Sequence, residues 1–256
     1  MEEHPLNPYT APAAVLEGGT GARAPASGGY RPLYGRANAV TIFLGLTILL
    51  EVLTAITAGA SIWALGRALA HEPVARDTLI AIDDGAAFLT KAHFAVFAAV
   101  VVSFCMLTHM AGSNAHSFGQ MRMEFTPGWA VGFYFIPFVA LWKPYQAMQE
   151  IWRASEPNTK ESFVLERAPV PGLLPGWWAT FLGHNLIARF TWTGRDAHDA
   201  QSLIQVNYVV IVSSLATIVA SIVAIALVRA LARRQDECQK AAEAFRSAQR
   251  AAAPAG

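Results

Sequence analysis

Apolar residues are gathered along the chain into long blocks instead of recurring at the spacing of a strand or of a half-buried helix. The clearest blocks run from about residue 39 to 65, from about residue 86 to 110 and from about residue 204 to 231. Each exceeds the roughly 20 residues that a helix needs to cross a bilayer core about 30 Å thick. The pattern therefore predicts three membrane-spanning helices.

Two shorter apolar segments lie between the second and third blocks. Pro127 to Trp142 covers 16 residues and has Pro137 in its middle, where the missing backbone N–H interrupts a helix. This segment is either a broken span or a re-entrant hairpin. Gly176 to Trp192 is a weaker candidate span, and its His184 and Asn185 are expected to form hydrogen bonds across helices.

Lys143 to Ala154 has the period of an amphipathic helix lying in the membrane interface. Its apolar side chains fall on one face and its polar side chains on the opposite face. The apolar set is Tyr145, Met148, Ile151 and Trp152, and the polar set is Lys143, Gln146, Gln149, Glu150 and Arg153.

The two ends of the chain differ from these blocks. Residues 1–37 contain five prolines among many glycines and alanines and show no apolar face, so we expect a disordered tail. Residues 236–256 are polar, and they are expected to be helical or disordered. The predicted domain organisation is thus a tail (1–37), a transmembrane helical domain (38–235) and a C-terminal tail (236–256).

The positions of Lys and Arg predict the topology, because cytoplasmic segments of membrane proteins are enriched in both. They gather in the N-terminal tail, after Trp142 and at the end of the last span; these residues are Arg23, Arg31 and Arg36, then Lys143, Arg153, Lys160 and Arg167, then Arg229, Arg233 and Arg234. Basic flanks at both ends require an even number of spans. We favour four full spans with re-entry at Pro137 and both termini cytoplasmic. In the alternative four-span arrangement, Gly176 to Trp192 lies in the interface.

Composition supports the membrane setting and narrows the partners. Hydrophobic residues make up 54% of the chain and charged residues 14%, against roughly 25% charged in soluble domains. The net charge of +1 gives no reason to expect a nucleic-acid partner. Membrane lipids, with a membrane-protein partner or a second copy of the chain, are the expected partners. Cys105 and Cys238 do not resemble a disulfide or a metal-binding pair.

Glu51 is the acidic residue deepest within a clear span, and a carboxylate there costs at least a few kcal/mol unless it is neutral, paired or facing water. Lys91 and His93 on the next helix are candidate partners, but the predicted helix ends offset Glu51 and His93 by about 9 Å, which argues against direct pairing. The alternatives are a protonated, hydrogen-bonded Glu51, a proton or cation site, and pairing with Lys143 or with another span. Glu51, His93, Pro137 and Lys143 are therefore the candidate functional residues.

The segment around Pro137 also carries candidate packing and anchoring residues. Gly128 and Gly132 have the small-xxx-small spacing that lets another helix approach closely. Aromatic side chains that suit the membrane interface surround them; the expected anchors are Trp129, Trp142, Tyr145 and Trp152.

Motifs of catalysis and metal binding are not evident in the sequence. The chain lacks a phosphate-binding glycine loop, a nucleophile elbow and an HExxH motif, and the spacing of His109 and His116 matches no zinc pattern. We therefore expect no enzymatic activity, no catalytic residues, no cofactor and no metal.

The stretch Pro127 to Ser155 contains PGWAVG, an aromatic run, FIPF, LWKPYQ and EIWRAS. It resembles the signature of the bacterial membrane proteins known as domain of unknown function 4328. One departure is Phe133 and Tyr134, where the family more often has a tryptophan-containing pair. The resemblance implies a fold and a bacterial membrane setting, but no particular activity.

The expected fold class is all-α. It is a polytopic membrane helical bundle with four full spans, a Pro-broken, re-entrant segment and an interfacial helix. The expected function is a structural or interaction role in the bacterial inner membrane. The alternative is a small transporter or channel component that uses Glu51 and the break at Pro137.

Overall fold

The computed structural model describes residues 29–157, 167–193 and 199–252, and the regular elements in these ranges are all helices. The predicted all-α class is therefore confirmed. The elements in chain order are α1 (Tyr34–Leu69), α2 (Arg76–Phe118), α3 (Pro127–Gly132), η2 (Phe133–Phe135), η3 (Val139–Leu141), α4 (Lys143–Ala154), α6 (Leu173–Thr193) and α7 (Ala200–Ala252).

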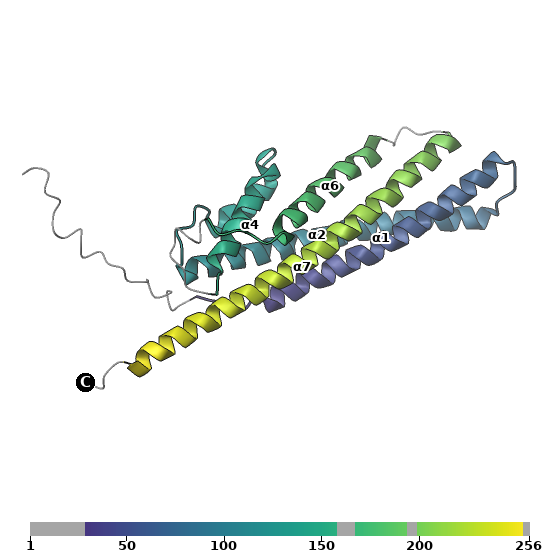
Figure 1. Cartoon of the computed structure of the whole chain (residues 1–256). Helices are drawn as coiled ribbons and strands as arrows, with labels where there is room; N and C mark the ends of the chain where they lie inside the picture. Colours follow the sequence, from purple (N-terminus) through teal and green to yellow (C-terminus); the bar gives the residue numbers. More distant parts are fainter. Residues whose placement is uncertain (1–28, 158–166, 194–198, 253–256) are drawn as a thin grey trace, which may run out of the picture.

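Three of these helices, α1, α2 and α7, are long and apolar enough to cross a bilayer. α1 packs most extensively against α7 and α2, while α6 lies along the first half of α7 (Figure 1). Side chains such as Ile42, Leu49 and Ile56 stay exposed along α1, as lipid-facing residues do. The predicted membrane nature of the chain agrees with these helices.

The ends of the long helices differ from the predicted ones. α1 continues to Leu69 and α2 already begins at Arg76, so most of residues 66–85, which separate the first two apolar blocks, is helical. A hydrogen-bonded helix can continue into water beyond the bilayer, and Asp77 in the first turn of α2 suits the positive end of the helix dipole. Apolar blocks therefore locate spans better than they locate helix ends.

Both predicted tails also overlap the helical fold. α1 begins at Tyr34, inside the expected N-terminal tail, and Leu33 before it is completely buried. α7 continues to Ala252, so most of the C-terminal tail is helical. The expectation of disorder for residues 1–28 and the basic residue Lys160 lie outside the described ranges.

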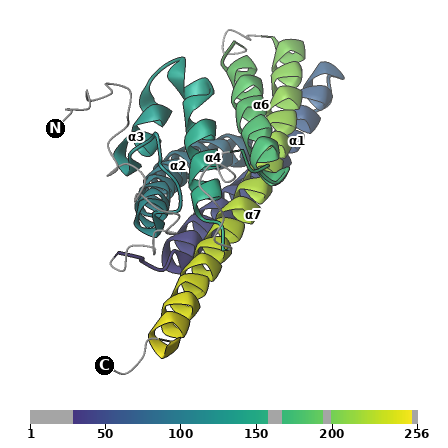
Figure 2. The same ribbon diagram turned by 60° about the vertical axis from the view of Figure 1, so that its left-hand side comes forward.

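Regular helix is interrupted between Phe135 and Val139, around Pro137. η2 ends at Phe135, and Phe138 has a φ of 63°. The amide of Val139 donates to the Pro137 carbonyl over 2.8 Å, which closes a γ-turn around Phe138. η2 packs against η3 and α4, so α3, η2 and η3 fold back as a hairpin of short helices (Figure 2). We call residues 127–142 the aromatic hairpin.

Gly128 and Gly132 do not mediate close helix packing within the described chain. A Cβ atom at Gly128 would meet nothing within 4 Å, and one at Gly132 would meet the ring of Trp129 from the same hairpin. The close approach occurs at Gly112 of α2, where a Cβ would lie 3.3 Å from the Cα of Pro127. α2 and α3 can therefore meet because residue 112 has no side chain.

We predict that Gly112→Leu lowers the thermal unfolding midpoint of the detergent-solubilised protein. The leucine must displace the backbone at Pro127, and overpacking of this kind costs about 1 to 3 kcal/mol. Gly128→Leu is the matched control, because the space around Gly128 is open. Equal midpoints for the two variants would show that α2 and α3 do not depend on this contact.

Candidate functional site

Glu51 of α1 and His93 of α2 contact each other inside the bundle. Oε1 of Glu51 lies 3.3 Å from Nε2 of His93, and the two side chains are 13% and 29% exposed. The expectation that an axial offset keeps them apart was wrong. Glu51 lies 18 residues before the end of α1 and His93 lies 17 residues after the beginning of α2, so a short turn brings them level.

The His93 ring is also held by its own helix. Its Nδ1 atom lies 2.9 Å from the carbonyl oxygen of Leu89, one turn earlier in α2. Nε2 is buried and, apart from the contact with Glu51, has no partner among the described residues. The ring therefore presents a single nitrogen to the carboxylate.

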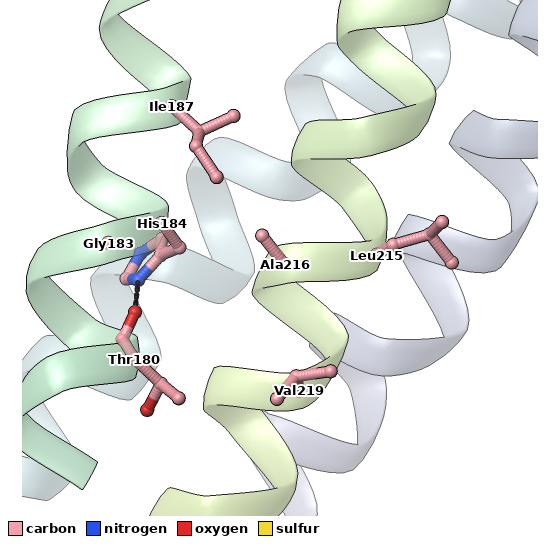
Figure 3. A pocket seen from close by; sticks show the side chains of 7 residues that line it. All are labelled: Thr180, Gly183, His184, Ile187, Leu215, Ala216 and Val219. Atoms are coloured by element: carbon pink, nitrogen blue, oxygen red, sulfur yellow. Dashed lines mark hydrogen bonds between the residues drawn. The ribbon is translucent and has the colours of Figure 1, made fainter. Parts of the chain in front are cut away.

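His184 of α6 is a further titratable side chain among the long helices. His184 borders a groove of about 310 Å³ between α6 and α7 (Figure 3). Its Nδ1 atom lies 3.3 Å from the Thr180 carbonyl, and Asn185 donates to the Phe181 carbonyl over 2.7 Å. Both side chains bond within their own helix, contrary to the expected bonds across helices.

The other two candidate residues lie elsewhere. Lys143 is 3.7 Å from a carboxylate oxygen of Glu124 and its ammonium lies 4.6 Å from the centre of the Phe125 ring, so it does not pair with Glu51. Pro137 is exposed in the aromatic hairpin, whose short helices pack mainly against one another and against α2 and α4. Of the four candidates, the structure brings together only Glu51 and His93.

A second polar cluster, which we call the amide network, lies where the ends of several helices meet. Asn114, Ser155 and Gln235 are completely buried. Nδ2 of Asn114 donates to Oε1 of Gln235 over 2.9 Å, and Nε2 of Gln235 donates to Oγ of Ser155 over 3.0 Å and to the Ala111 carbonyl over 2.9 Å. Asn114 also exchanges two hydrogen bonds with the backbone of Arg31. The amide network joins the segment before α1 to α2, α4 and α7.

Sequence reasoning missed the amide network. The available signal is that Asn114 lies within the small-residue run MAGSNA and that Gln235 comes four positions after the end of the last apolar block. Neither residue has a partner nearby in sequence, since Gln235 lies 121 positions from Asn114. Only the fold places the two amides together.

The bounds predicted for the amphipathic helix agree with α4, but its polar side chains bind the chain itself. Buried Glu150 accepts the backbone amides of Glu124 and Phe125, the latter over 3.1 Å. Nε of Arg153 donates to the Ala168 carbonyl over 2.9 Å. These contacts tie α4 to the segments that precede and follow it.

The predicted aromatic anchors divide into two groups. Trp129 and Trp142 are about half exposed, at 55% and 48%, and are free to contact lipid. Tyr145 instead stacks on Trp178. The ring of Trp152 lies 4.7 Å from the guanidinium of Arg234, which also forms a 2.8 Å ion pair with Glu156.

The described ranges hold no group of three His, Cys, Asp or Glu side chains arranged to bind a metal. Cys105 and Cys238 are both free thiols. Nε2 of Gln120 lies 3.2 Å from Sγ of Cys238, and burial raises the pKa of this thiol to about 12, so it remains protonated at neutral pH. Neither cysteine is placed to act as a nucleophile together with the Glu51–His93 pair.

The sequence family described as Domain of unknown function (DUF4328) matches residues 70–233. The chain belongs to this family. The DUF4328 region contains His93, the aromatic hairpin, α4 and α6, while Glu51 lies before it and Gln235 just after it. No curated protein and no solved structure matches the chain.

We predict that Gln235→Leu destabilises the protein. The substitution leaves Asn114, Ser155 and the Ala111 carbonyl short of hydrogen bonds in a completely buried place, and each buried polar group left unsatisfied costs about 1 to 3 kcal/mol. Gln239→Leu, one turn later on an exposed part of α7, is the control. The readout is the thermal midpoint in detergent, and an unchanged midpoint for Gln235→Leu would contradict a stabilising role of the amide network.

Proposed function

We propose that this DUF4328 protein is a non-enzymatic integral protein of the bacterial inner membrane with a structural or interaction role. The proposal rests on the aromatic hairpin, whose apolar apex is exposed. The polar side chains of α4, by contrast, bind other parts of the same chain. The expected contacts are with lipids and with a membrane-protein partner or a second copy.

The apex of the aromatic hairpin suits a hydrocarbon environment. Phe135 is 64% exposed, Ile136 37% and Phe138 78%. The backbone of Phe138 has a positive φ, which costs about 1 to 3 kcal/mol in a residue with a side chain. Contact of this apex with acyl chains or with a partner helix would offset that cost, and Trp129 and Trp142 would anchor the base of the hairpin.

The C-terminal part of α7 offers a second surface for a partner. It projects beyond the other helices (Figure 1) and carries charged side chains together with Phe245, which is 44% exposed. Such a helix can dock a soluble or membrane partner without changing the packing of the spans.

The proposed topology has four spans, formed by α1, α2, α6 and α7, with a re-entrant aromatic hairpin and both termini in the cytoplasm. α6 has 21 residues, so it is about 32 Å long and matches the bilayer core. The end of α6 and the beginning of α7 lie at the same end of the bundle as the turn between α1 and α2 (Figure 1). The distribution of Lys and Arg supports placing the opposite end in the cytoplasm.

Labelling of single cysteines with a membrane-impermeant maleimide tests this topology, in a chain whose two native cysteines are replaced by alanine. Glu72→Cys and Gln201→Cys are expected to react from outside intact cells. Glu124→Cys and Arg167→Cys are expected to react only after permeabilisation. All four positions are exposed.

Two outcomes of the labelling would contradict the topology at separate points. If Arg167→Cys reacts from outside, the aromatic hairpin crosses the membrane fully. If Gln201→Cys is protected from outside while Glu72→Cys reacts, α6 does not cross.

Transport is the second candidate function, because an ionisable pair inside membrane-spanning helices is a common feature of ion pathways. The proposed structural role predicts that purified protein in vesicles with an enclosed pH dye gives no proton flux above protein-free vesicles. It also predicts that removal of residues 244–256 releases any partner that co-purifies with the full-length chain.

Flux that is lost in Glu51→Gln but retained in Glu72→Gln would favour transport over the structural role. The control is matched in chemistry, since Glu72 is an exposed carboxylate paired with Arg67 outside the bundle.

A further inference from the structure

The two nitrogens of the His93 ring face different kinds of atom. Nδ1 lies 2.9 Å from the Leu89 carbonyl oxygen. A carbonyl oxygen only accepts hydrogen bonds, so Nδ1 must carry a hydrogen for this contact to be favourable. Nε2 faces a carboxylate oxygen of Glu51 at 3.3 Å.

This arrangement decides what lies between Nε2 and Glu51. A neutral imidazole with its hydrogen on Nδ1 has a lone pair on Nε2, and an ionised carboxylate presents only lone pairs. Two lone pairs facing each other at this distance repel. The contact becomes favourable when one proton lies between the two atoms, either on Nε2 or on the carboxyl group.

We propose that Glu51 and His93 form a proton-binding site that holds a single shared proton between α1 and α2. With the proton bound, the pair is neutral overall, whether it is an imidazolium beside a carboxylate or a neutral ring beside a carboxyl group. When the proton leaves, the pair carries one negative charge and its two lone pairs repel. Proton binding therefore joins α1 to α2 at this level.

Among the side chains that the structure describes, no Lys or Arg forms an ion pair with Glu51. On α2, Lys91 is exposed and lies two positions before His93, which places it on a different face of the helix. On α7, no charged residue occurs from Ala200 to Val228. On α6, His184 is itself titratable, and it borders the groove against α7 (Figure 3).

The apolar surroundings of Glu51 and His93 favour the form of the pair that holds the proton. A lone charge among membrane helices is costly unless it is paired, whereas a neutral hydrogen-bonded pair is tolerated. The groove between α6 and α7 is lined by apolar side chains apart from Thr180 and His184. The shared proton leaves the pair without a net charge, so that the pair is tolerated among apolar side chains.

This inference goes beyond the proposed structural role and does not depend on it. A proton site can fix two helices of a scaffold, and it can equally serve a pathway for protons. Its test therefore measures where the proton is, and not whether protons cross the membrane.

The experiment uses the full chain in lipid nanodiscs, with histidine labelled by ¹⁵N and glutamate labelled by ¹³C in its carboxyl group. Nitrogen resonances report which atoms of the His93 ring carry hydrogen, and the infrared carboxyl band reports protonation of Glu51. His93→Gln and Glu51→Gln assign the two signals. At neutral pH we expect a hydrogen on Nδ1 and one further proton, either on Nε2 or on Glu51.

On raising the pH, the His93 and Glu51 signals are expected to change together in one step as the shared proton leaves. In Glu51→Gln the carboxyl signal and the joint step are lost. In His93→Gln the Glu51 band is expected to shift away from the pH of the wild-type step. Glu72→Gln, an exposed carboxylate, should leave the step unchanged.

The proposal is overturned by a neutral His93 whose hydrogen is on Nε2 beside an ionised Glu51 at neutral pH. It is also overturned if the two groups titrate at unrelated pH values in the wild-type protein. Both results are read from the unmodified sequence, so the test stands even if a variant fails to fold. Circular dichroism and the thermal midpoint check that each variant used for assignment retains the bundle.

Discussion

Burial of two side-chain amides, Asn114 and Gln235, is the constraint on which the arrangement of the other elements depends. In lipid, apolar helices gain little by exchanging lipid contacts for contacts with each other, so close packing and hydrogen bonds decide how they associate. The Gln235 amide meets this need by bonding to α2 and α4 at once, and Asn114 adds the segment before α1. None of these side chains reaches water, and each has hydrogen-bond partners within the amide network, so the network favours one register of the helix ends.

At the end of the bundle away from the amide network, α1 and α2 are joined by a short turn, residues 70–75. This turn fixes the level of α2 against α1, and with it the meeting of Glu51 and His93 more than four helical turns away. A loop longer by a few residues would allow the two helices to slide, and a polar pair in the apolar part of the bundle would then be broken. The ionisable pair and the turn therefore specify the same register.

Much of the fold could be predicted from the sequence, because apolar length, proline and amphipathic period act locally. The bounds of α4 and the break at Pro137 follow from such signals. The Glu51–His93 contact could not be predicted, because its geometry depends on where helices end in water, which apolar blocks do not report. The amide network and the close approach at Gly112 were missed because their partners are distant in sequence. The glycines that look like a packing motif, Gly128 and Gly132, have no such partner in the described chain.

The DUF4328 match leaves out α1, although the matched helices depend on contacts with it. The DUF4328 region begins at residue 70, so it includes His93 but neither Glu51 nor the rest of α1. Without α1, Nε2 of His93 would lose the carboxylate that it faces, and α7 would lose the helix against which it packs most extensively. Both a polar pair and a large apolar surface thus require α1. The matched region is therefore incomplete as a folding unit, and the helix before it supplies Glu51, the acidic partner of His93.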